Sequence, residues 1–168
     1  MIEIRLLTPE DSESFWQLRL ESLITSPETF GSTYKEDSVR PMEEVKARLA
    51  PSSSSFILGA CTQDGRIVGM LGFKQEQSIK VKHKGFLWGM YVNPMFRNQG
   101  IGKKLIVEAI KRAKSADGLE QINLGVVTDN ASAKRLYQSA GFIVYGLEKN
   151  ALKYNGEYYD EELMVYRL

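Results

Sequence analysis

The sequence is poor in the residues that build covalent or metal-bound frameworks. It contains one cysteine, Cys61, and one histidine, His83, among 168 residues. A single cysteine excludes an internal disulfide framework and is typical of a protein in a reducing cytoplasm, where we expect this one. With one histidine between two lysines and no paired cysteines, we expect no bound metal. Cys61 ends an apolar run, and we interpret it as a small buried residue rather than a nucleophile.

The chain also lacks long apolar segments and an excess of charge of one sign. No apolar run approaches the ~18–20 residues needed to cross a bilayer. Glu3, Arg5 and Asp11 interrupt any signal-peptide pattern near the N-terminus. The 22 basic and 21 acidic residues give a net charge of +1, so no global field favours nucleic acid or an anionic membrane. We therefore expect neither of these as a partner.

Local patterns predict a mixed sheet covered by helices. Strands are predicted at 2–6, 56–62, 67–74, 85–92 and 121–127, with a closing pair at 142–147 and 158–168. Helices are predicted after Thr8-Pro9, at 42–49, from about 101 to 116 and from Asp129 or Asn130 to Gly141, with a loop at 25–41 that contains at most one short turn. A helix joining two strands at 101–116 is typical of a parallel crossover. We predict an α/β fold with about seven mostly antiparallel strands, about four helices, and one domain over residues 1–168.

The most informative segment is Arg97-Asn98-Gln99-Gly100-Ile101-Gly102-Lys103-Lys104. It lies between a predicted strand and a predicted helix. The first turn of a helix has four backbone N–H groups without intrahelical partners, and its dipole end is partly positive. Glycines at 100 and 102 remove side chains that would keep an anion away from those donors. The segment therefore predicts a diphosphate cradle, although its spacing matches neither the P-loop nor the dinucleotide fingerprint.

A second motif follows the next predicted strand and runs from Asn130 to Phe142. Asn130 and Tyr137 lie seven residues apart, which is two helical turns, so they project on one face near the same cleft. Each residue also has a structural interpretation. Asn130 is a suitable N-cap, and Tyr137 is a suitable core residue of an amphipathic helix.

Together the two segments resemble the GCN5-related N-acetyltransferase (GNAT) family. Arg97-x-x-Gly100-x-Gly102 matches the acyl-coenzyme A motif of that family, and the segment from Asn130 to Phe142 resembles its next conserved block. The resemblance implies a β-bulge on the fourth strand, which splays that strand from the parallel fifth. Acetyl-CoA would enter the gap as though it were an extra strand.

The resemblance also implies roles for individual residues. Tyr137 would point at the thioester sulfur and protonate the departing thiolate, and an N–H near Met90 or Tyr91 would stabilise the oxyanion. Phe30 and Tyr34 lie in the loop that would roof the acceptor site. The residues implied in binding the cofactor are Met90, Tyr91, Val92, Arg97, Asn98, Gln99, Gly100, Ile101, Gly102, Lys103, Asn130 and Tyr137.

The general base has no clear counterpart in this sequence. Residues 87–92 of the predicted fourth strand include no carboxylate, and the fifth-strand position that is glutamate in ribosomal-protein alanine acetyltransferases is Gly125. A water chain could remove the proton from the attacking amine. The alternatives are acidic side chains that the fold could bring near the thioester, namely Glu36, Glu76, Glu157 and Asp160.

The function implied is transfer of acetyl from acetyl-CoA to a primary amine, with coenzyme A as product. The acceptor would be a small molecule, an amino acid or a protein N-terminus. Two alternatives stay open: a coenzyme A-binding sensor without turnover, and a transferase for a longer acyl group. Exposed strands at the C-terminal end are compatible with a homodimer.

Overall fold

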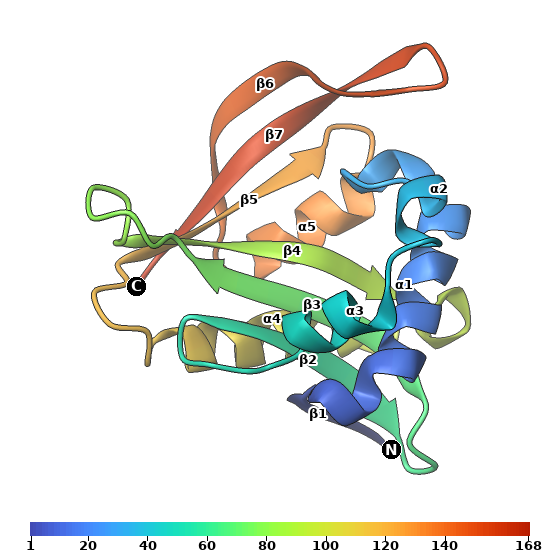
Figure 1. Ribbon diagram of the computed structural model, residues 1–168. Helices are drawn as coiled ribbons and strands as arrows, with labels where there is room; N and C mark the ends of the chain where they lie inside the picture. The colour runs from blue at the N-terminus through green and yellow to red at the C-terminus, as the bar shows by residue number, and fades with distance from the viewer.

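A seven-stranded mixed sheet organises the computed structural model, which describes residues 1–168 (Figure 1). The strand order is β1-β2-β3-β4-β5-β7-β6, and every neighbouring pair is antiparallel except β4 and β5. The strands are β1 (Ile2–Leu6), β2 (Ser55–Thr62), β3 (Ile67–Gln75), β4 (Lys84–Val92), β5 (Gln121–Val127), β6 (Ile143–Tyr154) and β7 (Glu157–Arg167). The predicted fold class, with its parallel fourth and fifth strands, is confirmed.

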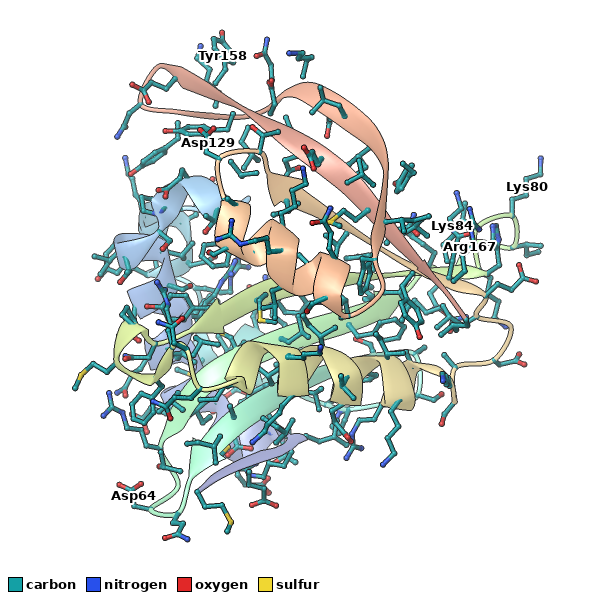
Figure 2. All side chains as sticks on the ribbon, turned by 180° about the vertical axis from the view of Figure 1, so that it is seen from behind. Asp64, Lys80, Lys84, Asp129, Tyr158 and Arg167 are labelled. Carbon is teal, nitrogen blue, oxygen red and sulfur yellow. The ribbon has the colours of Figure 1, made fainter.

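Five α-helices cover the two faces of this sheet (Figures 1 and 2). They are α1 (Ser12–Thr25), α2 (Tyr34–Asp37), α3 (Met42–Arg48), α4 (Ile101–Ala113) and α5 (Ala131–Ser139), with 3-10 turns η1 (Pro9–Asp11), η2 (Pro27–Thr29) and η3 (Pro94–Phe96). Helices α4 and α5 lie on one face, and α1 to α3 lie on the other. No helix combines the length and the apolar character needed to span a membrane.

The core under α4 follows from the periodicity of its sequence. Six of its apolar residues are at most 7% exposed and pack against β1 to β4: Ile101, Leu105, Ile106, Ala109, Ile110 and Ala113. Full burial of a large apolar side chain contributes about 1.5–3 kcal/mol, so this face fixes α4 on the sheet. The N-terminus of α4 is thereby held at the end of β4. Cys61 is buried on the other face, as predicted.

A bulge in β4 separates it from β5. Met70 of β3 pairs with Tyr91, whereas Gly72 pairs with Trp88, so Leu71 faces the two residues Gly89 and Met90. Gly89 has φ of +68°, which is a conformation that glycine adopts without strain. Strands β4 and β5 pair only from Lys84–Gln121 to Phe86–Asn123 and then diverge (Figure 1). The expected bulge and splay are present.

The loop predicted at 25–41 contains the short helix α2, so the number of helices is five rather than four. Two features stabilise this turn. Thr33 and Glu36 form a capping box, in which the Glu36 carboxylate accepts from the Thr33 N–H at 3.0 Å and the Thr33 hydroxyl accepts from the Glu36 N–H at 3.2 Å. Asp37 is fully buried and pairs with Arg19 and Arg40. The capping box is a local signal, but the ion pairs are tertiary contacts.

The first closing strand is longer than predicted, because β6 continues to Tyr154, whereas β7 keeps the predicted length and is shifted by one residue to begin at Glu157. Asn155 and Gly156, with φ of +50° and +79°, form the turn between them. This Asn-Gly pair is a strong hairpin signal that the sequence analysis missed. A register shift between Glu148 and Leu152, with Asn150 at φ of +52°, interrupts the alternation that would have revealed the strand. The hairpin extends away from the rest of the sheet (Figure 1).

Strand β6 forms one edge of the sheet and exposes apolar side chains. The most exposed of them are Ile143, Val144, Tyr145 and Leu147. An unpaired apolar edge of this kind is suited to a second strand or a second subunit. The homodimer stays a prediction.

Candidate active site

A cavity of about 490 Å³ opens where β4 and β5 diverge. It is lined by the end of β4, the segment leading into α4, the start of α5 and the loop after α1. Of the residues expected in the site, the structure brings together Phe30, Met90, Tyr91, Val92, Arg97, Asn98, Gly100, Ile101, Gly102, Lys103 and Asn130. Gln99, Tyr34 and Tyr137 do not line the cavity. Gln99 is exposed beside it, and Tyr34 is 45% exposed at the start of α2.

The segment before α4 presents unpaired backbone donors. The first hydrogen bond of α4 runs from the Lys104 N–H to the Gly100 carbonyl at 3.1 Å. None of the six amides from 98 to 103 donates to another protein group. Gly100 is the N-cap with φ of +77°, and no heavy atom lies within 4 Å of a Cβ added there. The backbone therefore offers six N–H groups at the positive end of a 13-residue helix.

Gly102 has a different role from Gly100. A Cβ added at Gly102 would lie 2.7 Å from Cδ2 of Leu136 on α5. The missing side chain therefore lets α4 and α5 approach each other, which aligns the two helix N-termini on one side of the cavity.

The cavity wall formed by β4 is held by side chains from neighbouring elements. Arg97 Nε donates to the Val92 carbonyl at 2.9 Å, and the guanidinium lies 5.5 Å from the centre of the Tyr91 ring. Asn93 caps η3 through the Met95 N–H at 2.9 Å and donates from Nδ2 to Glu21 of α1 at 2.6 Å. These contacts fix the chain between the bulge and α4.

Asn130 forms the N-cap of α5. Its Oδ1 accepts from the Ala133 N–H at 3.2 Å, so the structural interpretation of this residue is correct. The same side chain also lines the cavity. The two interpretations of Asn130 are compatible, because the cap uses the side-chain oxygen and leaves the NH₂ donors of Asn130 without a protein partner.

Tyr137 lies two turns farther along α5, within the core between α5 and the sheet. It is 7% exposed, and its ring meets Phe142 edge-on with 5.9 Å between the centroids. Burial raises the pKa of its hydroxyl well above the ordinary value of tyrosine. The phenol therefore stays protonated at physiological pH and retains a proton that it can donate.

A carboxylate occupies the space above Gly125, where the sequence lacks the expected glutamate. Oε1 of Glu161 on β7 lies 3.1 Å from the position of a Cβ added at Gly125. Glu161 pairs in register with Val127, which lines the cavity, so both side chains are on that face of the sheet. Burial, assisted by repulsion from Glu148 on β6, raises the pKa of Glu161. A raised pKa is typical of a general base.

Like Glu161 itself, the four acidic residues proposed from the sequence are not among the residues that line the cavity, and none of the four lies against Gly125 as Glu161 does. Glu36, Glu157 and Asp160 are hydrogen-bonded to Thr33, Tyr159 and Asn150 respectively. Glu76 pairs through its backbone with Lys84, at the end of β4 opposite the divergence. Glu161 can be identified only from the register of β7 against β5, which brings it close to Gly125, 36 positions earlier in the chain. No local pattern contains that information.

A buried arginine on α1 lies next to the bulge of β4, on the face of the sheet opposite α4 and α5. Arg19 of α1 is 6% exposed, and its Nε donates to Asp37 at 3.4 Å. Its guanidinium lies 5.1 Å from the centre of the Phe30 ring, and Phe30 meets Tyr91 edge-on at 6.4 Å. Phe30 therefore separates Arg19 from the cavity. Burial lowers the pKa of Arg19 and Asp37 opposes the shift, but an arginine stays charged in proteins.

Charge is distributed unevenly around the cavity. Arg97 and Lys103 lie beside the unpaired amides, whereas Glu28 is in η2 and Asp129 directly precedes the N-cap of α5. Asp129 is at the end of the molecule opposite Lys80, Lys84 and Arg167 (Figure 2). The cradle end of the cavity thus suits an anion, and the β5 end suits an ammonium group.

Comparison with known proteins agrees with this geometry. The model of the acetyltransferase (GNAT) family matches residues 15–142. The chain is 29% identical over 165 residues to the L-amino acid N-acetyltransferase AaaT of Escherichia coli strain K12, covering 98% of this chain and 96% of that protein. It is 27% identical over 143 residues to an aminoglycoside N(6')-acetyltransferase type 1 of Stenotrophomonas maltophilia, covering 83% and 84%.

The fold is likewise similar to solved structures. A GNAT-family acetyltransferase from Streptococcus pneumoniae superposes with a TM-score of 0.87 at 26% sequence identity, and all of both chains is covered. The similarity therefore includes the β6–β7 hairpin and the first helices as well as the central motifs.

Proposed function

Because the chain belongs to the GNAT acetyltransferase family, we propose that it transfers acetyl to the primary amine of a small molecule, an amino acid or a protein N-terminus. Acetyl-CoA is the cosubstrate. The observation that carries the proposal is the row of six unpaired amides at 98–103, next to a cavity between two diverging strands. We propose that residues 1–168 act as one N-acetyltransferase domain.

In this proposal the six amides bind the diphosphate of the cosubstrate, assisted by the positive charges of Arg97 and Lys103. The free edge of β4 at Met90, Tyr91 and Val92 pairs with the pantetheine amides, as a strand would. Asn130 contributes its side-chain NH₂ group. The fit is supported by the cavity itself, because β4 has no partner strand along this edge beyond Phe86.

The cosubstrate supplies an activated thioester, and the chain supplies the proton transfers. Glu161 accepts a proton from the attacking amine as the nitrogen–carbon bond forms. A backbone N–H at the bulge, from Met90 or Tyr91, stabilises the negative charge that develops on the carbonyl oxygen. Tyr137, which is buried in the core rather than lining the cavity, is the proposed donor of the proton that the sulfur takes up as the carbon–sulfur bond breaks, which gives coenzyme A and an amide.

The contribution of the cradle is tested by two matched glycine substitutions. Gly100 and Gly118 have φ of +77° and +73°, and a Cβ at either position meets no atom within 4 Å. Gly100→Ala and Gly118→Ala should therefore lose similar stability, about 1–2 kcal/mol, from the same backbone strain. Only Gly100→Ala places a methyl group against the proposed diphosphate site, and it should raise the Kd for coenzyme A about tenfold, or about 1.4 kcal/mol.

Calorimetry with coenzyme A and thermal unfolding measure both quantities. Equal loss of affinity in the two variants would show that strain, rather than the methyl group, determines binding. Unchanged affinity in Gly100→Ala would place the diphosphate elsewhere.

The activity itself is tested by thiol release from acetyl-CoA with a panel of amino acids, amino acid amides, polyamines, aminoglycosides and peptides. We expect turnover with at least one amine. Tight binding of coenzyme A without thiol release from any member would favour the sensor alternative. Faster release from propionyl-CoA or succinyl-CoA than from acetyl-CoA would favour the longer acyl group.

A further inference from the structure

Arg19 has more hydrogen-bonding capacity than its surroundings use. A guanidinium has five N–H donors, and the one bond that Arg19 makes is from Nε to Asp37 at 3.4 Å. Its Nη1 is fully buried and has no partner. Asp37 does not depend on Arg19 alone, because Arg40 donates to its other oxygen at 3.1 Å. A buried charged donor without an acceptor costs free energy, so a ligand that supplies an acceptor gains it.

The unpartnered atom lies next to the bulge of β4. Arg19 Nη1 is 3.9 Å from the position of a Cβ added at Gly89, and it is the atom nearest to that position. Because Gly89 has no side chain, nothing from that residue lies between the guanidinium and the backbone of the bulge. Met90 and Tyr91, the next two residues, line the cavity. Phe30 stacks on the guanidinium and also lines the cavity, so displacement of one ring would expose Nη1 to it.

We propose that Arg19 binds a carboxylate of the acceptor, and that the acceptor is a free α-amino acid. The inference rests on the proposed function, because it assigns the acceptor of the same site. A guanidinium forms strong, directional hydrogen bonds with a carboxylate. The amine of an α-amino acid is two bonds from its carboxylate carbon, so the two groups must bind close together. Arg19 beside the bulge satisfies this requirement, since the acyl group is expected at the same bulge.

The charges on the other side of the divergence complement the amino group. Asp129 lines the cavity just after the end of β5. The carboxylate of Glu161, on β7, lies close to Gly125 of β5. The carboxylate of a zwitterionic amino acid would therefore lie near Arg19, beside β4. Its ammonium group would lie near Asp129 and Glu161, beside β5. A peptide N-terminus and an aminoglycoside lack a carboxylate next to the reactive amine, so they leave Nη1 unpaired.

The test compares the 20 common L-amino acids with their carboxamides as acceptors in thiol release. For the best amino acid, we expect kcat/KM to exceed that of its amide about 10- to 100-fold, which corresponds to a hydrogen bond to a charged group. Norleucine should likewise be preferred over 6-aminohexanoate, whose amine is five carbons from the carboxylate. Equal rates for acid and amide would overturn the proposal.

The variants separate ligand binding from the structural role of Arg19. Arg19→Gln combined with Asp37→Asn removes the buried pair together, so neither charge is left alone. It should raise KM for the amino acid about 10- to 100-fold and leave KM for the amide unchanged. Arg40→Gln is the matched control, because it removes the other guanidinium on Asp37, and KM should stay within about twofold. An equal rise in KM for acid and amide, or the same effect in Arg40→Gln, would overturn the proposal.

Two further measurements test the proposal if the double variant does not fold or if no amine releases thiol. If the double variant does not fold, Arg19→Lys keeps a charge beside Asp37 but loses the fork of donors, and should still raise KM for the amino acid about tenfold. If no amine releases thiol, the proposed function fails, and calorimetry with N-acetyl amino acids in the presence of coenzyme A tests the carboxylate site separately. Binding that is lost in the Arg19 variant would support the site, and absence of binding would overturn it.

Discussion

Tyr137→Phe should lower kcat for thiol release about 100-fold or more, which is the usual contribution of a general acid. Its effect on the Kd for coenzyme A should be less than about twofold, because the ring remains packed on Phe142. The hydroxyl is the only group removed. Because burial raises the pKa of Tyr137, wild-type kcat should show no loss from its ionisation up to about pH 10.

Tyr166→Phe provides the matched control. Tyr166 stacks on the same Phe142, with 5.5 Å between the centroids, but it comes from β7 and does not face the thioester in the proposed arrangement. The Tyr166→Phe variant also loses one hydroxyl group, but its kcat should stay within about twofold of wild type. Steady-state thiol release and calorimetry measure both effects. Wild-type kcat in Tyr137→Phe would show that water or another group protonates the sulfur.

Glu161→Gln should have an effect of similar size for a different reason. A base acts only when it is deprotonated, so kcat/KM should rise with pH through the pKa of Glu161. Since that pKa is raised, this rising limb of the plot of kcat/KM against pH should have its midpoint above the ordinary pKa of glutamate, about 4.3. Glu161→Gln should lower kcat/KM at neutral pH about 100-fold and remove this limb. Glu148→Gln removes the repulsion and should move the limb to lower pH without abolishing activity.

The control for this substitution is Glu162→Gln. Glu162 is the next residue on β7, but strand alternation directs it to the opposite face, where it pairs with Lys134 of α5 at 2.8 Å. Its kcat/KM should stay within about threefold of wild type, with a small loss of stability. Unchanged kcat/KM and pH profile in Glu161→Gln would leave proton removal to a water chain.

The pH dependence of stability provides an independent test of the role of Glu161. A folded-state pKa above the unfolded value means that the contribution of the group to stability is present at acid pH and lost as pH rises through the folded pKa. Glu161→Gln should therefore match wild type in Tm at acid pH and equal or exceed it at neutral pH. A residue with a purely structural role would show the opposite combination, a lower Tm with activity retained, so the two measurements together identify a residue kept for chemistry rather than for folding.

The parts of the site that the sequence predicted are those encoded by neighbours in the chain. Gly100 directly precedes the amphipathic helix α4, Gly102 is its second residue, and Asn130 caps α5 beside the cavity. Both motifs therefore carry their geometry within a dozen residues. The helix period alone does not bring Tyr137 to the same cavity, because that residue is buried in the core. The position of α4 on the sheet follows from its apolar face, because burial of that face determines which side meets the strands.

The parts that were missed depend on contacts between distant residues. Glu161 becomes a candidate base only when the register of β5 and β7 is known, since Gly125 and Glu161 are far apart in sequence. Arg19 had a partial signal, because it shares the buried face of α1 with Phe15 and Leu23. A charge at such a position indicates a buried partner, but the identity of that partner, Asp37, depends on a helix that the sequence analysis assigned to a loop.

The parallel seam between β4 and β5 contains only three register pairs, from Lys84 to Phe86. Beyond it, the two halves of the sheet are joined through helices and loops rather than through a ladder of backbone bonds. In the proposed arrangement, acetyl-CoA would form backbone hydrogen bonds along that gap, so it would contribute to the structure as well as to the reaction. Because a ligand that binds only the folded state raises the apparent free energy of unfolding, the proposed binding mode predicts that this stability increases with the concentration of acyl donor.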